Sequence, residues 1–198
     1  MKIIAFEGLD ASGKATQTKM LVEGLRGRGF SVVSESFPRY EEPIGKLIQS
    51  WLKGEVNLTP EAAHMLYEAD RQDFMQALEQ YEDAGFDYLI IDRYTLSNLA
   101  FGMARGIDLG WLSSLQEQVR KPDTTIILDV APYESFNRRP ERRDRNETDA
   151  KLLHRSRGAY DFLSRNAADH PNLVLLDASG TKQDVHEAIL ELIDLGFA

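Results

Sequence analysis

The sequence of 198 residues contains no cysteine, which excludes disulfide bonds and thiolate metal sites. It has no apolar run near the ~18 residues that a membrane-spanning helix requires, so we expect no membrane association. Positive charge is also scarce, because 23 basic residues face 32 acidic ones and leave a formal net charge of −9. This balance argues against a general nucleic-acid binder, although local clusters can still bind small anions. The chain opens with "MKIIAFEG" and shows no signal-peptide pattern, so we expect a cytoplasmic protein.

Short apolar runs alternate with helical patterns along the whole chain. Five runs predict strands, at residues 2–6, 31–37, 88–93, 124–130 and 173–178. Helices are predicted over residues 15–27, 43–54, 59–85, 95–104, 109–119, 132–139, 149–166 and 181–195. This alternation predicts a three-layer α/β fold, in which helices cover both faces of a doubly wound, five-stranded parallel sheet. The length favours a single domain over residues 1–198.

A glycine-rich motif follows the first predicted strand and opens the first predicted helix. It reads Gly8, Leu9, Asp10, Ala11, Ser12, Gly13, Lys14, and matches the phosphate-binding pattern G-x-x-x-x-G-K. Glycines let backbone N–H groups turn inward, the helix N-terminus adds partial positive charge, and the lysine can reach the outer phosphates of a nucleotide. A plain glycine turn is the alternative in this position.

The residue after the lysine is Ala15, where a hydroxyl that contacts Mg²⁺ is usual, and Thr16 lies about 100° further round the helix. Because alanine cannot ligate a metal, we expect Mg²⁺ to be held mainly by nucleotide phosphates and water. Asp10 or Asp92 would assist, since magnesium keeps several of its waters.

A second anion site is predicted at the carboxyl edge of the sheet, where open α/β sheets bind ligands. Asp92 and Arg93 end the third predicted strand, and Arg39 in "FPRY" ends the second. Arginine can hold a phosphate bidentately. The alternatives are an ion pair at the end of the strand for Arg93 and a solvated loop residue for Arg39.

Aromatic and polar residues on two predicted helices indicate a base-binding site. Tyr67 and Arg71 share one helix face at a spacing of four residues, so they could stack on a base and hydrogen-bond its edge. Asn98 and Phe101 lie one turn apart after "DRY". Core packing is the alternative for each of them. They indicate a base-binding site because we expect all four to converge on one cleft.

An arginine-rich segment over residues 135–149 predicts a helical lid. It contains Arg138, Arg139, Arg142, Arg143 and Arg145 in an otherwise acidic chain. Phosphoryl transfer needs cations on the developing charge, and a lid supplies them on closure. The alternative is a solvated basic face.

Taken together, these motifs resemble the thymidylate kinases, and the resemblance spans nearly the whole chain. It is carried by "FEGLDASGKATQT", "FPRYEEPIGKLI", "LYEADR", "DRYTLSNLAFG", "KPDTTIILDV" and "LLDASGTKQDVHEAI" in this order. The resemblance implies a fold of the P-loop kinase type, transfer of the γ-phosphoryl group of ATP to dTMP with Mg²⁺ present, and a homodimer.

The resemblance also implies a role for each matching residue. Gly8 to Thr16 would hold the ATP phosphates, and Ala178 in "DAS" would lie near the adenine. Asp10 would lie near the deoxyribose 3′-hydroxyl and the metal. The dTMP site would consist of Asp10, Phe37, Arg39, Tyr67, Arg71, Arg93, Ser97, Asn98 and Phe101. In it, Arg39 and Arg93 would bind the phosphate, Tyr67 would stack on thymine, and Arg71 and Asn98 would read the base. Phe101 would disfavour a ribose 2′-hydroxyl.

The catalytic set implied in this way is Lys14, Arg93, Asp10, Arg138, Arg142 and Arg143. Because Ala11 stands where some members place an arginine, the cation for the transition state should come from the lid. Two alternatives stay open: a kinase for another nucleoside monophosphate, and a P-loop ATPase or switch protein without an acceptor.

Overall fold

The computed structural model describes residues 1–138, 144–166 and 172–194. Within these residues five parallel strands form one sheet, in the order β2–β3–β1–β4–β5. The strands are β1 Lys2–Gly8, β2 Val32–Ser36, β3 Tyr88–Asp92, β4 Thr124–Asp129 and β5 Leu173–Asp177. In the central register, Ile4 of β1 lies opposite Ile90 of β3 and Thr124 of β4. The predicted five-stranded parallel sheet is therefore confirmed.

Helices connect the strands. In the described part of the chain they are α1 Lys14–Gly27, α2 Pro43–Leu52, α3 Pro60–Asp83, α4 Thr95–Ala104, α5 Leu109–Leu115, α6 Pro132–Arg138, α7 Arg145–Thr148, α8 Ala150–Asn166 and α9 Lys182–Leu192. None of them is long and apolar enough to cross a membrane.

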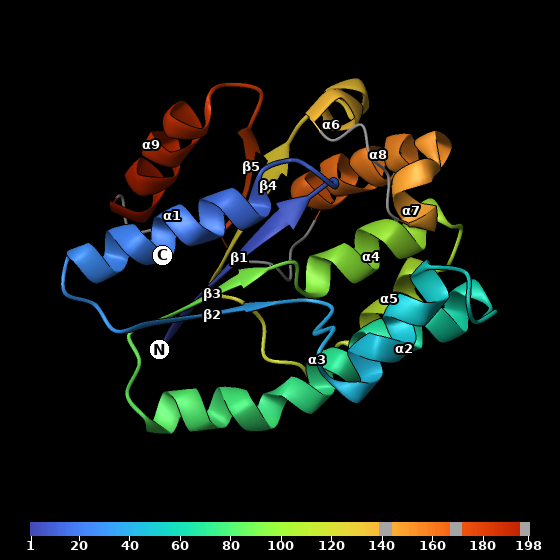
Figure 1. Ribbon diagram of the computed structural model, residues 1–198, viewed down its shortest axis with the longest axis horizontal. Helices are drawn as coiled ribbons and strands as arrows, with labels where there is room; N and C mark the ends of the chain where they lie inside the picture. The colour runs from blue at the N-terminus through green and yellow to red at the C-terminus, as the bar shows by residue number, and fades with distance from the viewer. Residues whose placement is uncertain (139–143, 167–171, 195–198) are drawn as a thin grey trace.

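The sheet is buried between two helical layers (Figure 1). On one face, Ile4 and Phe6 of β1 pack with residues of α1 and α9 such as Leu21 and Ile189. On the other face, α3 packs over β1 and β3, while α4 and α8 pack over Ile127 of β4. Alternate side chains of a strand point to opposite faces. In β1, Ile4 and Phe6 face one layer and Ile3 and Ala5 face the other, so the middle of this strand is apolar on both sides.

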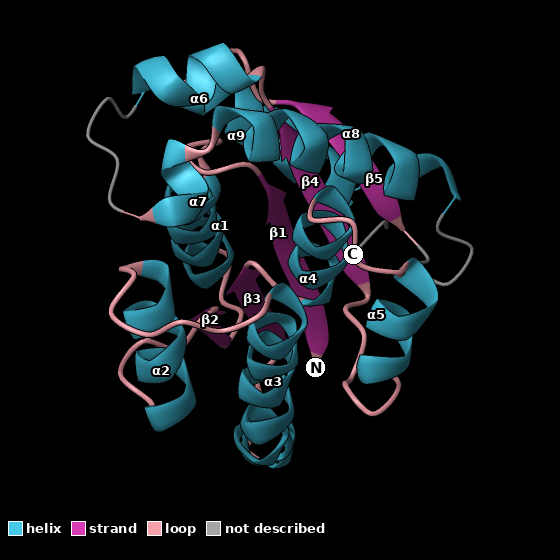
Figure 2. Ribbon diagram, turned by 90° about the vertical axis from the view of Figure 1, so that its right-hand side faces the viewer, coloured by secondary structure: helices cyan, strands magenta, loops and turns pink. Residues whose placement is uncertain are grey.

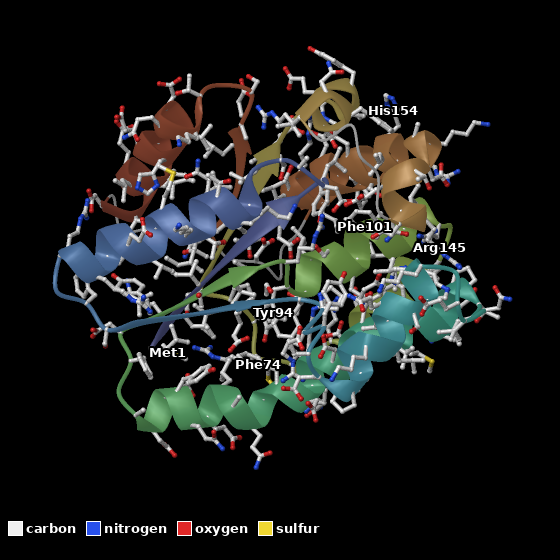
Figure 3. The ribbon with its side chains drawn as sticks, in the orientation of Figure 1. Met1, Phe74, Tyr94, Phe101, Arg145 and His154 are labelled. Atoms are coloured by element: carbon white, nitrogen blue, oxygen red, sulfur yellow. The ribbon has the colours of Figure 1, made fainter. Side chains whose placement is uncertain are left out.

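The layer formed by α3 brings aromatic side chains against the sheet. Phe74 of α3 and Tyr94, which follows β3, lie between this helix and the strands (Figure 3). Phe37, at the end of β2, contacts both rings, with centroids 5.4 Å from Phe74 and 5.5 Å from Tyr94. This aromatic cluster fixes the ends of β2 and β3 relative to α3, where the candidate site begins.

A side-chain cap explains the start of α3. The Thr59 side chain accepts a hydrogen bond from Ala62 N, and Pro60 occupies the first turn of α3. Helix α5 ends at Leu115 rather than at the predicted residue 119. The chain turns there, and the Gln116 side chain donates to the carbonyl of Thr95, so a contact with α4 sets this end.

The arginine-rich segment contains the end of α6 and all of α7. Asp144 caps α7 by accepting from the backbone N–H groups of Asn146 and Glu147. In both ribbon views α7 lies between α6 and α2 (Figure 2). Arg139, Arg142 and Arg143, which belong to the predicted lid, lie outside the described residues.

Candidate functional site

The loop between β1 and α1 has the backbone that a phosphate-binding loop requires. Gly8 has φ 129° and Gly13 has φ 104°, a region that favours glycine. A Cβ on Gly8 would lie 2.5 Å from the carbonyl oxygen of Leu128 in β4, so no larger residue fits there without a shift. Helix α1 starts after Gly13 without a side-chain cap, which leaves its first backbone N–H groups to bind an anion.

Lys14 lies inside this loop. Its ammonium group donates to the carbonyl oxygens of Leu9 at 2.7 Å and Gly8 at 3.3 Å. Burial, and after it the nearby guanidinium of Arg93, lower the pKa of Lys14 to about 8. Among the described residues this ammonium group donates only to carbonyl and hydroxyl oxygens. An anion that binds beside it would therefore stabilise its charged form.

Arg93 follows β3 in a left-handed conformation, with φ 64°, which costs a non-glycine residue about 1–3 kcal/mol. Its backbone N–H donates to the carbonyl of Phe6, so the turn is held against β1. The guanidinium lies 2.6 Å from Asp10, donates to the carbonyl of Gly8 at 3.1 Å, and stacks 5.4 Å from the ring of Phe101. Burial opposes its charge, but Asp10 and other acidic neighbours raise the pKa of Arg93, which stays cationic.

A buried carboxylate holds the start of α4. Glu7, at the end of β1, accepts hydrogen bonds from the backbone of Tyr94 at 2.8 Å and of Ser97 at 3.1 Å. It also accepts from the hydroxyl groups of Ser97 and Tyr160. Ser97 in turn accepts from Arg93 at 3.3 Å. Sequence reasoning missed Glu7; the signal was a charged residue in the otherwise apolar run "KIIAFEG".

Two cavities meet at this point. The first, the aromatic cavity, has a wall that includes Phe37, Tyr67, Arg71, Arg93, Ser97, Asn98 and Phe101. The second, the loop groove, is lined by residues 10–17 of the phosphate loop together with Asp92, Arg93, Arg138, Ala178 and Lys182. Asp10, Arg93, Tyr40 and Asp144 line both. The arrangement can therefore place two ligands end to end, with Arg93 between them.

The aromatic cavity contains most of the residues predicted to bind a base. Tyr67 lies edge-on to Trp51 of α2, with ring centroids 6.2 Å apart. Arg71 is 2 % exposed and donates to the carbonyl of Tyr67 at 2.7 Å. Asn98 and Phe101 reach the same wall from α4, and Phe101 is labelled in Figure 3.

Arg39 lies elsewhere in the described structure. Its guanidinium contacts Asp70 at 3.0 Å and Asp73 at 2.6 Å, both on α3, and it lines neither cavity. Burial works against its charge, but the hydrogen bond to Asp73 and the charge of Asp70 raise the pKa of Arg39. To reach a ligand in either cavity, Arg39 would have to leave these carboxylates.

The predicted lid arginines are described only in part. Arg138 donates to the carbonyl of Ala178 at 2.7 Å and reaches that of Ser12 at 3.5 Å, so it bridges the loop groove. Arg145, on α7, lies 4.8 Å from the ring centroid of Trp51 (Figure 3). Arg142 and Arg143 lie outside the described residues.

The residues beside the phosphate loop also suit a hydrated divalent cation. Asp92 Oδ1 is buried and has no hydrogen-bond partner among the described residues, and Asp92 lines the loop groove. Ala15 is exposed in the same groove and offers no hydroxyl. No group of three or more acidic, histidine or cysteine side chains in the described ranges could enclose a metal. A cation here would rely on ligand oxygens and water.

Sequence reasoning also missed His64 and Glu68. With Arg71 they follow a spacing of four and then three residues on α3, so they form one polar stripe on the face that packs against α4. All three are buried. The signal was this periodic set of polar residues within an amphipathic helix.

Comparison with known proteins identifies relatives over almost the whole chain. The family model for thymidylate kinase matches residues 6–189. A probable thymidylate kinase of Thermococcus kodakarensis is 33% identical, with 96% of each chain covered. The thymidylate kinase of Schizosaccharomyces pombe is 32% identical, over 97% of this chain and 91% of its own. The solved structure of thymidylate kinase from Candida albicans superposes with a TM-score of 0.85 at 27% identity, covering 98% of this chain and 91% of that one.

Proposed function

The chain belongs to the thymidylate kinase family, and we propose that it transfers the γ-phosphoryl group of ATP to dTMP, giving dTDP and ADP. One observation carries this proposal beyond the family: Arg93 lies in the wall common to the loop groove and the aromatic cavity. A protein that only binds or hydrolyses ATP has no need for a second, base-sized cavity that continues from the phosphate site.

The loop groove is the proposed ATP site. Residues 8–16 would hold the phosphates through backbone N–H groups, with Lys14 between the outer two. Ala178, a buried residue of the groove wall whose carbonyl accepts from Arg138, would border the adenine. Together these contacts hold the donor so that its terminal phosphate points at Arg93.

The aromatic cavity is the proposed dTMP site. Tyr67 would stack on thymine, Arg71 and Asn98 would bind its edge, and Phe101 would pack against the deoxyribose. Phe37 and Ser97 complete the wall. The acceptor phosphate would bind Arg93, whose guanidinium is already held by Asp10 and Gly8. Arg39 is a proposed second ligand of this phosphate, after release from Asp70 and Asp73.

Transfer between phosphates depends on positioning and on neutralising charge, without a protein nucleophile. Lys14 and Arg93 supply fixed positive charge on the two sides of the transferred group. Arg138, Arg142 and Arg143 are the proposed lid cations, and Asp10 the carboxylate near the acceptor sugar and the metal. Since two anions must be held side by side, losing any one of these cations should slow transfer more than it weakens folding.

Asp10 and Asp92 would hold Mg²⁺, together with water and nucleotide phosphates. The orphaned Oδ1 of Asp92 supports this assignment. When bound, the ion neutralises charge on the phosphates during transfer. Ala15 would take no part, in contrast to the hydroxyl usual at this position.

We also propose that residues 1–198 act as one domain, because both cavities draw their walls from segments between Asp10 and Val185. A homodimer is proposed from the family resemblance; Leu47 of α2 and Met65 of α3 expose apolar side chains that a partner could cover. The cytoplasm is the proposed location, since both substrates are charged nucleotides. Sedimentation velocity and cell fractionation test these two points.

The test of the activity is ADP formation from ATP and Mg²⁺ with each nucleoside monophosphate in turn, including a tube without acceptor. We expect strong turnover with dTMP, weaker turnover with dUMP and almost none without acceptor. Preference for a nucleotide with another base would leave the kinase activity standing and would overturn dTMP as its substrate. Equal turnover in every tube would indicate an ATPase.

A further inference from the structure

Four polar side chains are buried together beside the aromatic cavity, where apolar residues would be expected. His64, Glu68 and Arg71 come from one face of α3, and Asn98 comes from α4; their exposed fractions are 1%, 4%, 2% and 2%. Buried polar groups cost free energy unless they are hydrogen-bonded, so the pattern of bonds among them determines which atoms remain for a ligand.

The amide group of Asn98 is held in one orientation. Its Nδ2 lies 3.3 Å from the backbone carbonyl of His64 and 3.0 Å from Glu68 Oε2, while its Oδ1 lies 2.6 Å from His64 Nδ1. A backbone carbonyl can only accept, so the atom facing it must be the nitrogen. This assignment does not depend on the ionisation of Glu68, whose pKa burial raises.

The orientation of Asn98 fixes the tautomer of His64. Because Asn98 Oδ1 accepts, His64 Nδ1 must carry the hydrogen. Burial lowers the pKa of His64 to about 4, so the ring is neutral near pH 7 and its Nε2 is an acceptor. This Nε2 is buried and has no partner within the described residues.

The bonds leave a defined set of groups for a base. Both hydrogens of Asn98 Nδ2 are used, and only lone-pair capacity remains on Oδ1. Arg71 retains a buried Nε–H without a partner in the described part of the chain. His64, Arg71 and Asn98 all line the aromatic cavity, so the capacity left on this wall is a donor on Arg71 and acceptors on Asn98 Oδ1 and His64 Nε2. This matches a pyrimidine whose N3 carries a hydrogen next to the O4 carbonyl, and it mismatches cytosine, which has a bare N3 and an amino group.

We propose that His64 and Glu68 are positioning residues that hold the Asn98 amide with its oxygen toward the base, and so exclude cytosine nucleotides from the acceptor site. A flipped amide would turn its oxygen toward the backbone carbonyl of His64, where neither atom can donate. The proposal rests on the proposed dTMP kinase activity, because it concerns how that acceptor is chosen.

Two substitutions of His64 distinguish its hydrogen bond to Asn98 from the space that its side chain fills. In His64→Asn the amide nitrogen can take the place of Nδ1 and still donate to Asn98, whereas in His64→Gln it reaches the place of Nε2 and leaves Asn98 Oδ1 without its donor. The measurement is kcat and KM for dTMP and for dCMP, with thermal unfolding recorded for each variant. Tyr81→Phe is the matched control, because it also removes a polar contact of α3, the bond to Glu35, away from the cavity.

We expect His64→Asn and Tyr81→Phe to keep the ratio of kcat/KM for dTMP over dCMP within about 3-fold of the original. His64→Gln should lower that ratio at least ~10-fold, through a higher KM for dTMP and gained turnover of dCMP, with kcat for dTMP largely kept; about 10-fold corresponds to one hydrogen bond. Glu68→Met, which removes the acceptor for Asn98 Nδ2, should lower the ratio in the same direction, and it serves as the second variant if His64→Gln does not fold.

An unchanged ratio in folded His64→Gln and Glu68→Met, with both substrates slowed equally, would overturn the proposal and leave the pair a structural role. Failure of the unchanged enzyme to use dTMP would instead overturn the proposed function, and the positioning role with it. The two failures are distinguishable because the second is visible before any variant is made.

Discussion

The guanidinium of Arg93 lies 2.6 Å from a carboxylate oxygen of Asp10, and the two residues come from different strand ends, β3 and β1. Both side chains are mostly shielded, with 16% and 21% of their surface exposed. The contact therefore fixes the position of the one arginine that, among the described residues, lines both cavities, and it does so in the absence of either substrate. Preorganised charge of this kind accounts for much of the rate of phosphoryl transfer.

Replacing Arg93 with glutamine should lower kcat/KM for dTMP at least ~100-fold, about 2.7 kcal/mol of lost transition-state stabilisation. The fold should persist, because the backbone bond to Phe6 does not involve the side chain. Steady-state kinetics and circular dichroism check this. Arg165→Gln, which breaks an exposed arginine–aspartate pair on α8, is the control and should leave activity unchanged. Equal, small losses in both variants would contradict the role of Arg93.

ATP binding should draw a proton from solution near pH 8. The pKa of Lys14 is about 8 without ligand, so about half of the molecules carry a neutral lysine at that pH. A bound polyphosphate favours the charged form and raises this pKa, so uptake should approach about half a proton at pH 8. It should vanish below about pH 6.5, where Lys14 is already charged. Calorimetry in two buffers of different ionisation enthalpy measures it, and Lys14→Met should abolish it. Proton release, or uptake that persists in the variant, would contradict this assignment.

Gly8→Ala should destabilise the protein more than Gly29→Ala. Both glycines have positive φ, at 129° and 92°, but only a Cβ at Gly8 meets a neighbour, the carbonyl oxygen of Leu128 at 2.5 Å. Backbone strain alone costs about 1 kcal/mol at Gly29, and the clash should bring Gly8→Ala to about 3 kcal/mol. Urea unfolding of both variants tests this. Similar losses at the two positions would mean that the loop can shift away from β4 freely.

Ala15→Thr should lower the Mg²⁺ concentration needed for half-maximal rate by about 2- to 10-fold. The position is exposed in the loop groove, so a hydroxyl has room to contact the ion or one of its waters. Ala15→Val has the same shape without the hydroxyl and is the matched control. If threonine and valine both abolish activity while folding is intact, the small side chain is required for steric reasons and the metal argument is wrong.

The main features of the fold could be predicted from sequence because they follow local periodicity. Continuous apolar runs such as residues 88–93 predict strands buried on both faces, and Thr59 with Pro60 predicts the start of α3. The end of α5 could not be predicted, because a contact between Gln116 and the carbonyl of Thr95 sets it. Helix α7, over Arg145–Thr148, lies outside the predicted helices, one of which begins at residue 149, where Asp149 accepts from the backbone N–H of Leu152.

The site could be predicted where local motifs and spacings carry its parts. The loop over residues 8–14 and the strand-end pair Asp92 and Arg93 lie at the sheet edge as expected, since motif and topology are both local. Arg39 also lies at the end of β2, but its present partners come from α3, over thirty positions later in the chain. The hydrogen bonds among Glu7, Ser97 and Tyr160 could not be predicted either, because only folding brings β1, α4 and α8 together.

The most direct measurement of the central claim follows the phosphorus atom itself. ATP labelled in its γ-phosphate is incubated with the enzyme, Mg²⁺ and dTMP, and the label is separated into dTDP, inorganic phosphate and remaining ATP. Transfer between two adjoining cavities predicts that dTDP gains label in step with ADP formation and that inorganic phosphate stays at background. Label that appears mainly in inorganic phosphate, with or without dTMP, would contradict the account.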